Sequence, residues 1–201
     1  MENKITLIRT LKHLNLITKH RLVVFKLSCK IGIPWRGLVH DLSKYSPTEF
    51  WEGVKYFNGK HSPITDAKKD KGYSDAWLHH KGRNKHHTEY WTDESAPNNN
   101  PFPPYKYVAE MLCDKTAAGM IYNGKEWKDD VELKYYMYER TKIHINKNLD
   151  ELFIEFFTKL GEDGINKSFN KHYVEELYKK YYEKEKDRLP KGTGTFDRFA
   201  K

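Results

Sequence analysis

The chain has 201 residues, enough for one domain whose core needs no disulfide bonds. Its two cysteines, Cys29 and Cys113, are too few for a disulfide framework and lack zinc-site spacing, so we expect both to be reduced core residues. The formal net charge is +8, but Lys and Arg are scattered among many Asp and Glu. The charge therefore does not distinguish a phosphate-bearing ligand or a nucleic acid from an ordinary solvated surface. The sequence offers no signal peptide and no membrane span, which predicts a cytoplasmic protein.

Histidines are concentrated in one part of the chain. Ten are present, and six of them fall within less than a quarter of the sequence: His40, His61, His79, His80, His86 and His87. Neutral imidazole is the commonest metal ligand in proteins. The clustering is therefore the first indication of a metal site.

The first two predicted helices carry one inward-facing histidine and one His-Asp pair. Apolar spacing predicts a long helix over about 5–27, and His20 shares its apolar face, so its ring should point inward. A second helix begins at Pro34 and should carry His40 and Asp41 on its last turn. Ser46-Pro47-Thr48-Glu49 predicts a third helix over about 47–57, with Glu49 completing a capping box.

Two His-His pairs follow, seven residues apart. A helix predicted over about 65–80 places His80 on its buried face and points His79 elsewhere. Burying several imidazoles is costly unless each finds a partner, and a shared cation supplies one. His87 is favoured over His86, because two turns of a continued helix would align it with His80, although Gly82 weakens that continuity.

The rest of the chain is predicted to be helical apart from a proline-rich connection over 95–104. A helix over 105–122 carries Glu110 and Asp114 among apolar residues, where a carboxylate needs a partner. Polar helices are expected over about 129–145, 149–160 and 172–186. The sequence thus predicts an all-α, single-domain fold with a metal-binding core over 1–125, a packed helical extension over 126–190 and a loose tail over 191–201.

The candidate metal ligands are side chains that can face one interior site: His20, His40, Asp41, His80, His87 and Asp114. Three further residues are alternative ligands, or would orient the ligands through hydrogen bonds: His79, His86 and Glu110. Lys44, Lys81 and Arg83 could bind phosphate oxygens, although solvent-exposed charges explain Lys81 and Arg83 at least as well.

The order and spacing of these ligands resemble the HD-domain superfamily of metal-dependent phosphohydrolases over about residues 13–122. The run GLVHDLSK at 37–44 is similar to that family's second helix, including the lysine three residues past the aspartate. The resemblance implies an all-helical fold, catalytic roles for Asp41 and Lys44, and contact between Lys44 and substrate phosphate. The longer ligand set of this chain, with its extra histidines, is similar to that of HD-domain subgroups that hold two metals. The chain also resembles a small uncharacterised family from bacteria and phages.

Three functions are consistent with these observations. The first is a phosphohydrolase, a phosphomonoesterase or phosphodiesterase, that acts on a nucleotide or other small phosphate ester with one or two ions of Mn, Fe, Co, Ni or Zn. The second is an HD-type di-iron oxygenase, because imidazole and carboxylate ligands suit iron equally well. The third is a non-enzymatic basic module that binds nucleic acid or protein, which we favour least. The oligomeric state is not indicated by the sequence.

Overall fold

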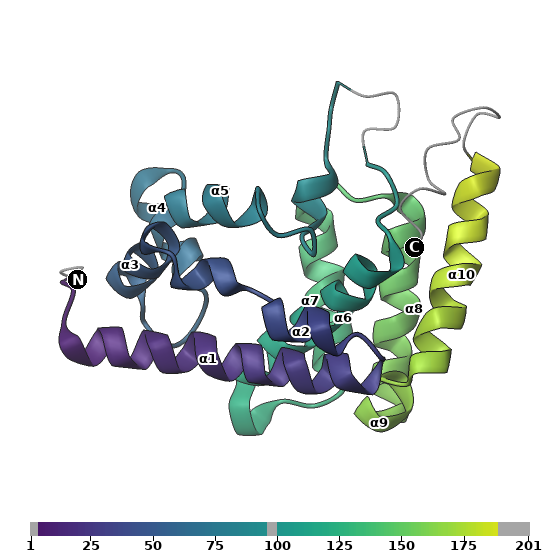
Figure 1. The fold of residues 1–201 in the computed structure, drawn as a ribbon, viewed down its shortest axis with the longest axis horizontal. Coiled ribbons are helices and arrows are strands. Elements are labelled where there is room, and N and C mark those ends of the chain that lie inside the picture. Colours follow the sequence, from purple (N-terminus) through teal and green to yellow (C-terminus); the bar gives the residue numbers. More distant parts are fainter. Residues whose placement is uncertain (1–3, 96–99, 189–201) are drawn as a thin grey trace.

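The structure is a computed structural model that describes residues 4–95 and 100–188 (Figure 1). Its regular secondary structure consists of helices. These ranges contain no strand, so the predicted all-α fold is confirmed. In chain order the helices are α1 (Leu7–Lys30), α2 (Pro34–Val39), α3 (Pro47–Tyr56), α4 (Pro63–Lys71), α5 (Asp75–Lys81), α6 (Tyr105–Asn123), α7 (Val131–Glu139), α8 (Lys147–Asp163), α9 (Ile165–Ser168) and α10 (Lys171–Arg188). Short 3-10 helices are η1 (Leu42–Tyr45), η2 (Thr88–Trp91), η3 (Gly124–Glu126) and η4 (Arg140–Lys142). None of the described helices is long and apolar enough to cross a bilayer.

Local sequence signals explain where several helices begin. Thr6 caps α1 by accepting a hydrogen bond from the backbone N–H of Arg9 at 3.2 Å. Pro34 and Pro47 occupy the first turns of α2 and α3, as predicted, because proline fits a position whose N–H has no partner within the helix.

Three local predictions were wrong. The helix expected over 65–80 is two helices, because Ser74 starts a new one by capping the backbone N–H of Trp77. Glu49 makes no capping box, since Ser46 forms no side-chain cap and the Glu49 carboxylate turns toward the histidines. Cys113 is buried, but Cys29 is exposed rather than part of the core.

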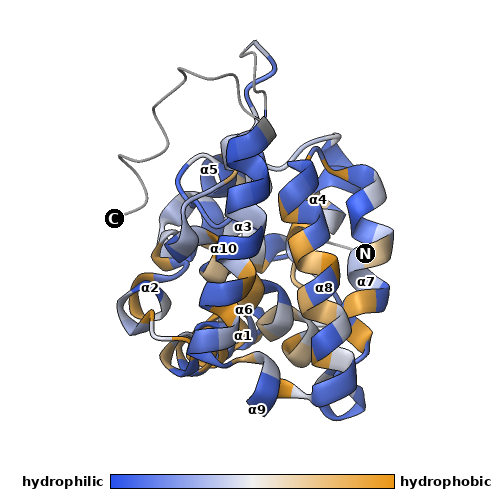
Figure 2. Ribbon diagram, turned by 90° about the vertical axis from the view of Figure 1, so that its right-hand side faces the viewer, coloured by the Kyte–Doolittle hydropathy of each residue, from blue (hydrophilic) through white to orange (hydrophobic). Residues whose placement is uncertain are grey.

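One apolar cluster joins the N-terminal and C-terminal helices. It includes residues from α1, α6, α8 and α10: Val24, Leu27, Met111, Leu112, Leu152, Phe153, Phe156, Phe157, Val174 and Leu177. Figure 2 shows hydrophobic positions of α8 facing the neighbouring helices. The helices after residue 125 therefore share a core with α1 and α6, while the tail predicted over 191–201 lies outside the described residues.

A close contact between α1 and α2 positions the segment that carries His40 and Asp41. A Cβ added at Gly37 would lie 2.6 Å from Ser28 Cβ and 2.9 Å from the Phe25 Cα. We expect Gly37→Ala to lower the free energy of unfolding by about 1–3 kcal/mol, because α2 must move away from α1. Thermal denaturation would show a fall in Tm of roughly 3–10 °C.

Leu38→Ala is the matched control, since this exposed side chain lies on the same helix. Its Tm should stay close to that of the unchanged protein. Equal Tm values for the Gly37 and Leu38 variants would show that the α1–α2 contact can relax without cost.

Candidate metal centre

Asp41 lies at the centre of a buried cluster of histidines and carboxylates, and it is only 1% exposed. The chain places His40 at the C-cap of α2 and Asp41 just beyond it, not on the last turn as predicted. Asp41 has φ 53°, and no other non-glycine residue among those described has a positive φ. Aspartate tolerates this left-handed conformation better than most residues, and such backbone strain often accompanies function.

The first set of ligand atoms, which we call group A, gathers near Asp41 Oδ2. It consists of His20 from α1, His40, Asp41 and Asp114 from α6. Asp41 Oδ2 lies 3.3 Å from His40 Nε2 and 3.8 Å from His20 Nε2. Asp114 Oδ1 closes the group at 3.0 Å from His20 Nε2 and 3.4 Å from His40 Nε2.

The second set, group B, gathers near the other oxygen of Asp41. It consists of Asp41, His80 from α5, and His86 and His87 from the turns before η2. Asp41 Oδ1 lies 3.3 Å from His80 Nε2 and 3.2 Å from His86 Nε2. His87 Nε2 lies 2.8 Å from His80 Nε2. Asp41 thus belongs to both groups and offers one oxygen to each.

The residues present fit divalent transition metals. Ligand atoms bonded to one such ion at about 2.0–2.2 Å lie roughly 3–3.5 Å from one another, which is close to the separations within both groups. No hydrogen bond of good geometry reaches either carboxylate oxygen of Asp41 or either ring nitrogen of His86, although charged or ligand-type neighbours lie close to all four atoms. Buried polar atoms normally have partners, and a shared cation would supply one. Imidazole and carboxylate donors suit Mn, Fe, Co, Ni and Zn.

Glu110 orients the ring of His40. Its Oε1 accepts a hydrogen bond from His40 Nδ1 at 2.9 Å, which directs the lone pair of Nε2 toward group A. Its Oε2 accepts from the Arg36 guanidinium, through Nε at 2.8 Å and Nη2 at 2.5 Å. Burial would raise the pKa of Glu110, but the hydrogen bond from His40 and the nearby His86 ring lower it to about 2. The carboxylate therefore stays ionised.

Glu49 performs the same role for group B. Its Oε2 accepts from His80 Nδ1 at 2.7 Å, so that His80 Nε2 faces Asp41. Its Oε1 accepts from His79 Nδ1 at 2.6 Å. Burial acts to raise the pKa of Glu49, but the bonds from His80 and His79 outweigh it and lower the pKa. His79 supports the site from outside the ligand groups.

Charge in the cluster favours ionised acids. Burial alone would raise the pKa of Asp41, but attraction to His40, Lys44 and His80 holds it well below its usual range. Hydrogen bonds from His20 and His40 likewise outweigh burial and hold the pKa of Asp114 well below its usual range. Lys44 Nζ lies 2.6 Å from Asp41 Oδ2. Burial opposes the charge on Lys44, but Asp41 and Asp114 raise its pKa, so the ammonium group persists at neutral pH.

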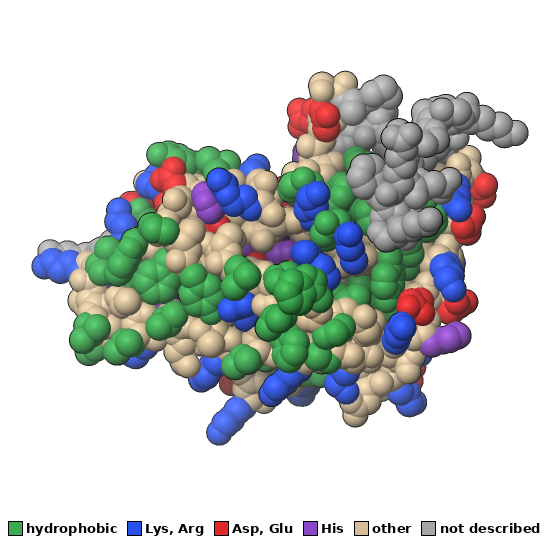
Figure 3. Space-filling view, in the orientation of Figure 1, with side chains coloured by type: hydrophobic (Ala, Val, Ile, Leu, Met, Phe, Trp, Pro, Cys, Tyr) green, Lys and Arg blue, Asp and Glu red, His purple; other side chains and the backbone are tan. Residues whose placement is uncertain are grey.

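The cluster opens into a pocket of about 550 Å³. Figure 3 shows histidine side chains near the middle of one face of the molecule, with Lys or Arg side chains next to them. Lys44, Lys60 and Lys115 line this pocket together with His20, His80, His86, His87 and Asp114. A pocket of this size accommodates a small organic ligand, and its lysines would attract an anion.

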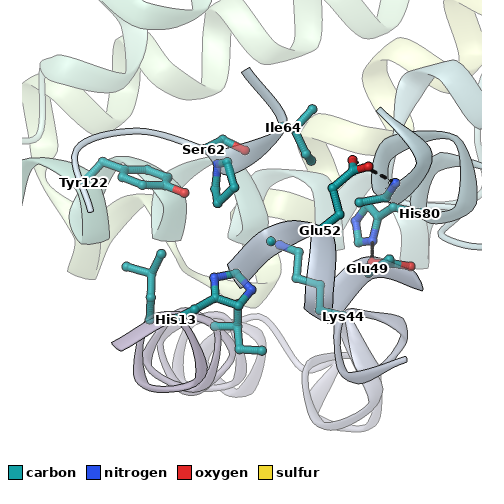
Figure 4. A pocket seen from close by; sticks show the side chains of 13 residues that line it. His13, Lys44, Glu49, Glu52, Ser62, Ile64, His80 and Tyr122 are labelled. Carbon is teal, nitrogen blue, oxygen red and sulfur yellow. Dashed lines mark hydrogen bonds and ion pairs between the residues drawn. The ribbon is translucent and has the colours of Figure 1, made fainter. Parts of the chain in front are cut away.

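Lys44 also borders a second, smaller pocket of about 70 Å³. In Figure 4 its side chain extends into the same space as His13, with Ser62 and Tyr122 across from it. Burial and the nearby Lys44 lower the pKa of His13 to about 4, and its Nδ1 has no hydrogen-bond partner. Lys44 therefore stands between the larger pocket and a cavity with room for a few water molecules.

One sequence family matches this chain. It is described as a family of unknown function (DUF5662), and the match covers residues 9–159. The chain belongs to this family. The matched region contains all the residues of groups A and B, as well as Glu49 and Glu110. No curated protein and no solved structure matches the chain.

The structure brings together all six residues that the sequence indicated as ligands: His20, His40, Asp41, His80, His87 and Asp114. It adds His86, which had been an alternative to His87. The predicted helical alignment of His87 with His80 is wrong, because α5 ends at Lys81. Lys81 and Arg83 do not line the two pockets, and an Arg83 N–H instead faces the His79 carbonyl at 3.4 Å.

Several residues of the site were not anticipated from the sequence. The sequence predicts a capping box for Glu49, and no local pattern indicates that Arg36, Lys60 or Lys115 belongs to the site. A signal for Glu49 existed, since Gly53 and Tyr56 lie one and two turns later on the same buried face of α3. A carboxylate on a buried helix face needs a partner. Lys60 and Lys115 reach the pocket only through tertiary packing, which no local pattern reveals.

The role of Glu49 leads to a prediction for metal affinity. Glu49→Gln should weaken metal binding at group B by about 10–100-fold, because the neutral amide has one acceptor oxygen, whereas the carboxylate offers one oxygen to His79 and the other to His80. Competition with a chromophoric chelator measures this affinity. Glu52→Gln is the control, since Glu52 lies one turn further along α3 and binds Lys71 and Ser74 instead of a ligand histidine. Equal affinities for the two variants would show that Glu49 does not orient His80.

Proposed function

We propose that this protein is a metal-dependent phosphohydrolase that acts on a nucleotide or another small phosphate ester. The observation that carries the proposal is the Asp41 carboxylate, which offers one oxygen to each of two ligand groups while Lys44 lies beside it. A pocket with three lysines opens directly over these groups. The resemblance to HD-domain phosphohydrolases in ligand order, from His20 through His40-Asp41 to Asp114, supports the same reaction.

In this proposal each ligand group holds one divalent cation. His20, His40 and Asp114 would hold the first, the three histidines of group B would hold the second, and Asp41 could offer one oxygen to each. Bound cations of this kind supply Lewis-acid chemistry, which activates water at neutral pH and neutralises charge on a phosphoryl group. Glu49 and Glu110 keep the ring nitrogens of His80 and His40 directed at the centre.

The lysines of the pocket bind the anionic end of the substrate. Lys44 is the principal candidate, because it keeps its proton beside Asp41 and also lines the pocket. Its ammonium group can donate to a phosphate oxygen and so place the phosphorus atom next to the metal centre. Lys60 adds positive charge on the pocket wall, which attracts a phosphate ester from solution, whereas Lys115 also lines the pocket but is paired with Glu139.

Metal analysis followed by a phosphatase screen tests this proposal. Purified protein should contain a stoichiometric transition metal and, with added manganese, should hydrolyse nucleoside monophosphates, cyclic nucleotides or p-nitrophenyl phosphate. If the protein binds metal but hydrolyses none of these phosphate esters, the proposed reaction is refuted, whereas the metal site is not. An oxo-bridged iron absorption band with dioxygen uptake would favour the oxygenase instead. Absence of metal with salt-sensitive binding to DNA or RNA would favour the non-enzymatic module.

A further inference from the structure

The pocket over the metal centre has an acidic far wall, formed by the first turn of α7. Glu132 lines the pocket there and is only 3% exposed. Its Oε1 accepts a hydrogen bond from Trp127 Nε1 at 2.7 Å. A tryptophan has a single N–H, so this bond uses only part of the capacity of a carboxylate to accept. Glu132 plays no role in the proposed hydrolysis at groups A and B.

The fold makes room for this carboxyl group at some cost. A Cβ at Gly119, in the interior of α6, would overlap Glu132 Oε1, so only glycine leaves space for the carboxylate at this point. Glycine within a helix is unfavourable for stability. Burial also raises the pKa of Glu132 to about 7, and Lys115, which opposes this rise, is already paired with Glu139. A carboxyl group placed in a pocket under these conditions is a candidate for ligand recognition.

Two tyrosines connect this carboxyl group with the phosphate end of the pocket. Tyr135 lies one turn after Glu132 on α7, and Tyr122 lies near the end of α6; both line the pocket. Burial raises the pKa of Tyr122, with Lys44 opposing and Tyr135 adding to the rise, so these three groups are neighbours. Lys44, Tyr122, Tyr135 and Glu132 all line this one pocket. Aromatic rings provide faces for a planar ring, and the carboxylate provides an acceptor at its edge.

We propose that Glu132 is a specificity-determining residue that accepts hydrogen bonds from the N–H groups of a nucleobase, so that the substrate is a nucleotide. The phosphate lies at Lys44 and the metal centre, and the base extends along the tyrosines to α7. A sugar phosphate without a base would offer the buried carboxylate no donor in addition to Trp127. The inference rests on the proposed function for the phosphate end only, because base recognition by Glu132 requires no hydrolysis.

The test compares substrates with and without a base. For each variant, kcat/KM is measured for nucleoside monophosphates, ribose 5-phosphate and p-nitrophenyl phosphate. Glu132→Gln should lower the ratio of nucleotide to p-nitrophenyl phosphate kcat/KM by about 10–100-fold, because a charge-assisted hydrogen bond is lost. Gly119→Ala should lower the same ratio, because the added methyl group displaces the carboxylate without changing its chemistry.

Glu126→Gln is the matched control, since Glu126 lies in η3, is exposed and does not line the pocket. It should leave the ratio unchanged. An unchanged ratio in both Glu132→Gln and Gly119→Ala would overturn the inference, and so would an equal loss for ribose 5-phosphate.

A binding measurement separates this inference from the proposed hydrolysis. If no phosphate ester is turned over, nucleosides are titrated calorimetrically into manganese-loaded protein. Binding that weakens at least about tenfold in Glu132→Gln would support base recognition while the hydrolase proposal fails. Absence of nucleoside binding by the unchanged protein would overturn the inference.

Discussion

Replacing Asp41 with asparagine should remove both metal ions and reduce phosphatase activity to background. Asp41 is the only residue shared by groups A and B, and an amide offers neither the charge nor two equivalent oxygens. Removing a hydrogen-bond partner of a ligand typically lowers metal affinity by 10–100-fold, so loss of a bridging ligand should exceed about 100-fold. Asparagine is the informative replacement because it also tolerates the left-handed backbone at this position.

Elemental analysis after dialysis gives the metal content of this variant, and circular dichroism shows whether its helices persist. Asp75→Asn is the control, because Asp75 lies in the first turn of α5 and binds Lys71 at the surface. It should keep full metal content. Unchanged metal content in Asp41→Asn would exclude the bridging role.

Glu132 should make the folded protein less stable as the pH rises. Its pKa is near 7 in the folded chain and near 4.5 when unperturbed, so the folded state binds the proton more tightly. Stability contributed by this proton is present below about pH 4.5 and is lost as the pH rises through 7. The difference corresponds to about 3 kcal/mol, and Glu132→Gln, which cannot ionise, should be more stable than the unchanged protein at pH 8 by up to that amount.

The measurement is the Tm of both proteins at pH 5 and pH 8, without added metal. The advantage of Glu132→Gln should appear at pH 8 and reach roughly 6–12 °C, given 2–4 °C per kcal/mol for a chain of this size. At pH 5 the two Tm values should be much closer. Lys115, Glu139 and Trp127 act on Glu132 and remain unchanged in this comparison. A Tm difference of the same size at both pH values would show that Glu132 ionises normally.

The sequence allowed the helices and most candidate ligands to be predicted because both depend on local patterns. Prolines at the first turns predicted the starts of α2 and α3, and apolar spacing directed His20 and His80 inward. Asp114 stood out as a carboxylate within an apolar helix. Each of these residues is positioned by its own helix, so helical periodicity is enough to predict its direction.

What could not be predicted depends on chain direction in turns or on packing between distant segments. His86 and His87 both reach the centre because the chain turns between α5 and η2. Such a turn has no periodic sequence pattern from which the direction of its side chains could be predicted. Arg36 and Glu110 are 74 residues apart and meet only where α2 packs on α6. Glu132 lies beyond the ligand series, and its place in the pocket follows from the packing of α7 against Gly119 of α6.

We expect Asp41 to join two separate metal sites, and metal stoichiometry tests this most directly. Protein stripped with chelator and reloaded with manganese should bind about two ions per chain. His20→Ala should lose the ion of group A, and His87→Ala the ion of group B, so each should retain about one. Asp41→Asn should retain neither. A protein that binds no stoichiometric metal, or variants of His20 and His87 that both keep two ions, would contradict the account.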